Sequence, residues 1–159
     1  MGISRDSGFR AWSLIVDIDA LLNPIYAKSF GELGMSMSYF DVLVNLLIAE
    51  NNEVRMSHLA ERTVISFSRV SRVIDELEEQ GLVERNPDPS DGRAVLIELT
   101  PSGREHLREA VRIHARDVLE NFSAHLGDAQ ALAVIDALET VMRAHGRVAS
   151  PTEVWSPSS

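Results

Sequence analysis

Residues 82–100 read LVERNPDPSDGRAVLIELT, and this stretch decides the fold. Two short runs of strand-forming residues flank a loop of turn formers from Pro87 to Gly92. Proline fixes φ and lacks a backbone donor, so the loop cannot extend a central strand ladder. The dipeptide Asp91-Gly92 is a strong turn signal, and apolar residues then alternate with the period of two typical of a strand. The pattern predicts a β-hairpin with a long polar tip and one basic residue, Arg93, just past the turn.

Two short helices are predicted before the hairpin. We expect Ser57 to cap the first, which ends near residue 64, and Ser66 to cap the second, which reaches Gln80. The second helix has apolar residues at the i, i+3, i+4 and i+7 spacing of a packed face, at Val70, Val73, Ile74 and Leu77. Helix, turn, helix and hairpin in this order predict a winged helix-turn-helix in a mostly α fold with a small β-hairpin wing.

Charge is unevenly distributed in this region. The whole chain has a formal net charge of −9, which argues against a non-specific polyelectrolyte binder. Residues 55–72 nevertheless contain four arginines and a single acid, and residues 75–79 then contain four acids and no base. Phosphate contact needs only a local positive face, so the basic segment is the part expected to meet phosphate.

Long amphipathic helices are predicted on both sides of this unit. Residues 7–33 have apolar residues at helical spacing on more than one face, with Pro24 as an expected kink or break. A capping box at Ser38 is expected to start a helix that runs to Glu50. Thr100-Pro101 is expected to start a long helix after the hairpin, and a last helix spans about residues 128–145.

These elements divide the chain into two regions and a tail. Residues 36–100 form the predicted winged helix-turn-helix, and residues 7–33 and 101–146 form a helical region. The helix at 7–33 is apolar on more than one face, and a partner subunit is the simplest source of the second surface in a chain this short. Residues 147–159 contain two prolines and several serines and are predicted to be a flexible tail.

Several protein classes are disfavoured by the composition. The chain has no cysteine, which excludes disulfides, thiolate metal sites and thiol redox sensing by this chain. We see no signal peptide and no membrane-length apolar run, so we expect a soluble, cytoplasmic protein. The five histidines form no metal-ligand pattern, and His114 is interpreted as a packed residue; no metal or other cofactor is expected.

The hairpin sequence and the order of elements resemble the MarR family of dimeric winged-helix transcriptional regulators. The matching motifs are Leu82 to Arg85, the run Asp88 to Arg93 that contains a D-x-R wing motif, and the Leu99-Thr100 that follows it. The resemblance covers roughly residues 8–146, and it implies that residues 7–33 and 101–146 form a helical dimerisation region. It implies that Arg93 enters the DNA minor groove, that Asp91 orients it by a salt bridge, and that the helix from Ser66 is the recognition helix. Many relatives have a second basic residue where Gly92 stands, so one phosphate contact is expected to be missing.

The resemblance also implies a function and two sets of site residues. We expect a sequence-specific DNA-binding regulator, more often a repressor in this family, that binds a pseudo-palindromic operator in double-stranded DNA as a homodimer and is released by a small aromatic ligand. The predicted DNA-binding residues are Arg62, Ser66, Ser68, Arg69, Arg72, Asp91 and Arg93. The predicted ligand-lining residues, for which an ordinary role in the core stays the alternative, are Trp12, Ile15, Tyr39, Leu43, Leu47 and Val111.

Other interpretations stay open at this point. Arg69 and Arg72 would be ordinary solvated residues if they paired with Asp75 and Glu76. The acidic net charge also suits a dimeric winged-helix module that contacts protein and binds no specific DNA. An enzyme is disfavoured, because the chain has no glycine-rich nucleotide-binding fingerprint and no recognisable catalytic arrangement.

Overall fold

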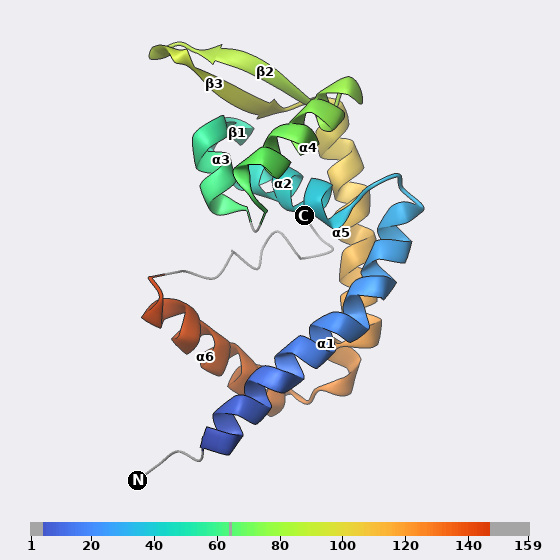
Figure 1. Cartoon of the computed structure of the whole chain (residues 1–159). Helices are drawn as coiled ribbons and strands as arrows, with labels where there is room; N and C mark the ends of the chain where they lie inside the picture. The colour runs from blue at the N-terminus through green and yellow to red at the C-terminus, as the bar shows by residue number, and fades with distance from the viewer. Residues whose placement is uncertain (1–4, 64, 147–159) are drawn as a thin grey trace.

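A computed structural model describes residues 5–63 and 65–146, which form six α-helices and a small antiparallel sheet at one end of the molecule (Figure 1). The predicted tail at 147–159 lies outside the described residues. The helices are α1 (Arg5–Gly31), α2 (Met37–Leu47), α3 (Met56–Arg62), α4 (Phe67–Glu79), α5 (Pro101–Asn121) and α6 (Asp128–Ala144). The strands are β1 (Glu53–Arg55), β2 (Val83–Asp88) and β3 (Asp91–Leu99). Two short 3-10 helices span Glu50–Asn52 and Ser123–His125.

The hairpin forms as predicted, but its turn lies two residues earlier than expected. The strand order is β1-β3-β2, so β2 is an edge strand, and Pro87 on it pairs opposite Val95. An edge strand tolerates proline because its outer side has no neighbour that needs a donor. The turn is therefore Pro89-Ser90, and Asp91-Gly92 begins β3. The Asp88 carboxylate holds this turn by accepting hydrogen bonds from the Ser90 amide at 2.7 Å and the Ser90 hydroxyl at 2.6 Å.

Three further boundaries differ from the sequence prediction. Ser36, not Ser38, caps α2, and its Oγ accepts from the Tyr39 amide at 3.2 Å. The helix ends at Leu47 and not at Glu50, because Ala49 takes an extended conformation with φ of −77° and ψ of 154°. Helix α3 starts at Met56 directly after β1, so Ser57 lies inside it.

Other predicted boundaries are confirmed. Ser66 is the N-cap residue of α4, and Gly81 follows its C-terminus with φ of +69°. Thr100 caps α5 by accepting from the Gly103 amide at 2.9 Å, with Pro101 at the first helical position. The break considered at Pro24 does not occur, because Pro24 lies inside α1, which continues from Arg5 to Gly31.

The hydrophobic core lies beneath the sheet, between α2, α4 and the first half of α5 (Figure 1). The predicted packed face of α4 is confirmed, since Val70, Val73, Ile74 and Leu77 are all buried. At the start of α5, Gly103 lies against the chain that leaves α4, and a Cβ atom there would be 2.0 Å from the Leu82 carbonyl oxygen. Glycine is therefore required for α5 to approach the winged helix-turn-helix.

We expect Gly103→Ala to lower the free energy of unfolding by about 3 kcal/mol, because the added methyl overlaps a backbone oxygen that cannot move without disturbing β2. Chemical denaturation of both proteins measures this loss. Gly8→Ala in α1 is the matched control, since nothing lies within 4 Å of its Cβ position and alanine favours a helix by about 1 kcal/mol over glycine. Equal stability of Gly103→Ala and wild type would contradict the steric argument.

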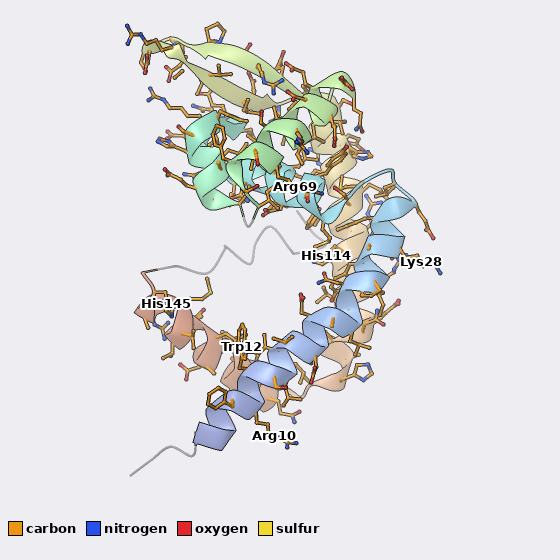
Figure 2. All side chains as sticks on the ribbon, in the orientation of Figure 1. Arg10, Trp12, Lys28, Arg69, His114 and His145 are labelled. Atoms are coloured by element: carbon orange, nitrogen blue, oxygen red, sulfur yellow. The ribbon has the colours of Figure 1, made fainter. Side chains whose placement is uncertain are left out.

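The junction of α1, α2 and α5 is an aromatic cluster around His114 (Figure 2). The imidazole lies edge-on to Tyr26 at 4.8 Å between ring centroids, and within 5.7 Å of Phe30 and 5.2 Å of Phe40. Burial lowers the pKa of His114, and the nearby Asp117 carboxylate opposes this. His114 is thus packed against aromatic residues of its own subunit, and its contacts join the long helices to α2. A place for His114 in a subunit interface stays a prediction.

The far ends of α1 and α6 diverge from the rest of the molecule, while α5 lies along α1 (Figure 1). No residue of α6 is buried, and no described helix is long and apolar enough to cross a membrane. The two helices leave large apolar side chains exposed at Phe9, Trp12, Leu14, Ile15, Val16, Ile18, Leu21, Leu132, Val134, Ile135, Leu138 and Val141.

Candidate nucleic-acid interface

The outer face of α4 presents polar and cationic side chains to solvent. Ser68, Arg69 and Arg72 are exposed on it, opposite the buried apolar face. Among the residues that the structure describes, neither arginine forms an ion pair or a side-chain hydrogen bond. The alternative in which Asp75 and Glu76 neutralise them is therefore not what the structure shows, and both guanidinium groups are available to an anionic partner.

Three of the four acids in the second half of α4 are bound by residues of other elements. Arg85 of β2 donates to Asp75 at 2.5 Å and also forms an ion pair with Glu78. These ion pairs join β2 to α4 and give Asp75 and Glu78 a cationic partner other than the exposed arginines. Sequence reasoning missed Arg85, although the period of two in β2 places it on the same face as the buried Val83.

Glu76, the remaining acid near the arginines, bonds to α2. Its carboxylate accepts from the Tyr39 hydroxyl at 2.6 Å. This hydrogen bond, with a smaller effect of burial, raises the pKa of Tyr39. The contact spans 37 residues of sequence and fixes α4 relative to α2.

The tip of the wing is attached to β1 by an ion pair. Arg55 lies 2.6 Å from the Asp88 carboxylate and donates to the Ser90 hydroxyl at 3.1 Å. The hydrogen bonds from the hydroxyl and amide of Ser90, followed by the guanidinium of Arg55, lower the pKa of Asp88. The acid that holds the wing is thus Asp88, and neither Asp88 nor Arg55 was among the predicted site residues.

The expected salt bridge between Asp91 and Arg93 is absent from the described residues. Asp91 instead accepts from the backbone amide of Arg93 at 3.1 Å, because both residues lie in the first three positions of β3 beside the turn. The Arg93 side chain is exposed at the base of the hairpin tip and has no ion pair among the described residues. It is free to reach a partner.

Two hollows flank α4. The first has a volume of about 570 Å³ and lies between α4 and the start of α2; it is lined by Gly34, Met35, Ser36, Tyr39, Ser66, Ser68, Arg69, Arg72, Val73 and Glu76. The second, of about 500 Å³, lies between α4 and the wing and is lined by Arg55, Met56, Ser57, Phe67, Ser71, Arg85, Asp91, Arg93, Ala94 and Val95.

These hollows bring six of the seven predicted DNA-binding residues to one side of the molecule. Four of them border the first hollow, and the two wing residues border the second. Arg62 is exposed in the last turn of α3 and lines neither hollow. A helix that projects between two hollows rich in guanidinium and hydroxyl groups can enter a groove between phosphate backbones.

The predicted ligand-lining residues are distributed over several environments. Trp12 and Ile15 are exposed on α1, at 64% and 43% of their surface (Figure 2). Leu43 is fully buried in the core, and Leu47 and Val111 pack against that core. Tyr39 alone among them borders the first hollow. Of the described side chains, no group of three or more acids or histidines is placed to hold a metal ion.

Comparison with known proteins gives the family. A model described as "MarR family" matches residues 33–94. The structure of AbsC, a MarR family transcriptional regulator from Streptomyces coelicolor, has 30% sequence identity and a TM-score of 0.78, over 89% of this chain and 95% of that one. The chain belongs to the MarR family.

Two further relatives agree with this assignment. Sco3205, a MarR family regulator from Streptomyces coelicolor solved in complex with DNA, has 26% identity and a TM-score of 0.78, over 94% of this chain and 93% of that one. The HTH-type transcriptional repressor YetL of Bacillus subtilis is 28% identical over 112 residues, which are 69% of this chain and 67% of YetL. AbsC and Sco3205 are described as transcriptional regulators and YetL as a transcriptional repressor.

Proposed function

We propose that this MarR-family protein is a sequence-specific DNA-binding repressor that binds a pseudo-palindromic operator as a homodimer in the cytoplasm. The observation that carries the proposal is the outer face of α4. Its arginines are exposed and unpaired among the described residues, while three of the four acids of the same helix are bound by Arg85 or Tyr39. The face is locally cationic in a chain of net charge −9, as groove binding requires.

Each part of the interface has a proposed role. Helix α4 enters the major groove, where Arg69 and Arg72 contact base edges or phosphates, and Ser66 and Ser68 contact groups nearby. Arg93 enters the adjacent minor groove, whose negative potential attracts a guanidinium. Asp91 supports the wing backbone at Arg93, and Arg62 contacts the DNA backbone beside α3.

The second copy of the chain is proposed to cover the exposed apolar residues of α1 and α6. These side chains come from two helices that converge in a region without a core of its own, as buried interface helices do. Two-fold symmetry then places the two α4 helices in successive major grooves, about 10 bp apart. Residues 7–33 and 101–146 would form this dimerisation region, and residues 36–100 the DNA-binding region.

A small aromatic effector is proposed to release the DNA. The proposed lining comes from Trp12, Ile15, Tyr39, Leu43, Leu47 and Val111, of which Tyr39 connects to α4 through Glu76. A ligand that favours a dimer with mis-spaced α4 helices must weaken operator binding by linkage. A compound that binds the protein and leaves operator affinity unchanged is not such an effector.

Fluorescence anisotropy with the DNA upstream of the protein's own gene tests the main proposal. At about 0.15 M salt, we expect binding at least about a thousandfold tighter than to a scrambled duplex. Arg93→Ala should weaken it, because the wing then loses its minor-groove cation. If that duplex and the scramble bind equally weakly, sites are selected from a random DNA pool, and failure to enrich any sequence would overturn the proposal.

The competing proposal is a winged-helix module that contacts another protein. The acidic net charge of −9 favours it. Salt-sensitive, sequence-selective DNA binding would exclude this alternative, because a protein-binding surface has no reason to discriminate between duplexes.

A further inference from the structure

Phe67, the first residue of α4, is a large apolar side chain on the surface proposed to meet DNA. It is 59% exposed, whereas the other apolar residues of this helix are buried. The cationic and hydroxyl-bearing side chains around it suit phosphate, which a phenyl ring cannot bind. An apolar group left in solvent at the start of a proposed recognition helix gains free energy when an apolar partner covers it.

The position of Phe67 on the helix determines what it can reach. At about 100° per residue, Ser68 and Arg72 point directly away from the core, and Phe67 lies on the side of α4 toward the wing. The two hollows confirm this order, because Arg69 and Arg72 border the first hollow and Phe67 borders the second together with Arg93. If α4 lies in the major groove and the wing in the adjacent minor groove, Phe67 faces the side of the major groove nearest the wing.

The major groove offers one apolar group at base edges, the C5-methyl group of thymine. The Ser57 and Arg93 side chains that share the second hollow with Phe67 can hold the neighbouring backbone, which would bring a base edge toward the ring. We propose that Phe67 packs against a thymine C5-methyl group and makes thymine a specificity determinant at one position of each operator half-site. The inference rests on the proposed DNA-binding function and adds to it the group that is read.

Deoxyuridine substitution tests this contact, because it removes the methyl group and leaves Watson–Crick pairing intact. Each thymine of one half-site of the selected operator is replaced in turn, and affinity is measured by anisotropy. Wild type should lose roughly fourfold in Kd at one thymine, the value expected for one buried methyl group. Phe67→Ala should bind the thymine and deoxyuridine duplexes equally well at that position, and its exposed site leaves the core unchanged.

Ser71→Ala is the matched control, since Ser71 borders the same hollow but has no apolar ring to lose. It should keep the fourfold difference between the two duplexes. Specific binding that is insensitive to deoxyuridine at every thymine would overturn the role of Phe67 and leave the regulator intact. If Phe67→Ala still binds the thymine duplex more tightly than the deoxyuridine duplex at that position, the role of Phe67 is likewise overturned and the regulator stays intact. A wild type without any sequence preference would instead overturn the proposed function itself.

Discussion

Arg72→Ala is expected to reduce the preference for operator over scrambled DNA by roughly tenfold to a hundredfold, with little change in the fold. Arg72 points directly away from the core of α4, is exposed, and forms no ion pair among the described residues. A bidentate arginine–guanine contact discriminates against a wrong base by about 1–3 kcal/mol. Anisotropy titrations of the two duplexes with both proteins measure the change in their ratio.

A phosphate contact has a different signature, and Arg62→Ala provides the comparison. Losing a backbone contact should weaken all sequences alike and reduce the slope of log K against log salt by about one. Arg108→Ala is the charge control, because Arg108 lies on α5 and pairs with Glu105 away from the proposed interface. If Arg72→Ala weakened both duplexes by the same factor, Arg72 would be a phosphate ligand and the base contact would belong elsewhere on α4.

The elements governed by local sequence were predictable. The packed face of α4 follows from apolar spacing alone, and the start of α5 follows from Thr100-Pro101, where the cap and the fixed proline φ act within one turn. The predicted position of the hairpin turn is wrong because it rests on the local turn preference of Asp91-Gly92 alone. Asp88 is held by Arg55, 33 residues earlier in the sequence, and this contact together with the edge position of β2 places the turn at Pro89-Ser90.

The same limit applies to the candidate site. The exposure of Arg69 and Arg72 follows from the helical period. The bonding partners of the acids that come after them do not. The sequence allows Asp75 to bond to a residue one helical turn away or to a distant strand. Only the folded structure shows that its partner is Arg85. The contact from Tyr39 to Glu76 is also long-range. Phe67 has the i, i+3, i+7 spacing of a packed residue with Val70 and Ile74, so its exposure of 59% is visible only in the folded chain.

Leu21→Glu is expected to convert the proposed homodimer to a monomer with a folded winged helix-turn-helix. Leu21 is 65% exposed in the single chain, so the substitution disturbs no core contact of its own subunit. In a symmetric dimer the change occurs twice in one interface, and burying an unpaired carboxylate there costs several kcal/mol per copy. Sedimentation velocity measures the mass, and far-UV circular dichroism checks the fold.

Val95→Glu is the matched control for the sedimentation measurement. It replaces an exposed apolar residue on the wing by the same charged residue and should leave the dimer intact. Operator affinity of Leu21→Glu should fall by more than about a hundredfold, since a monomer engages one half-site and loses the effective concentration supplied by the second. A Leu21→Glu protein that stayed dimeric would place the interface elsewhere. A monomer that kept full operator affinity would show that one α4 and one wing are enough for recognition, and the exposed apolar residues of α1 and α6 would then need another partner.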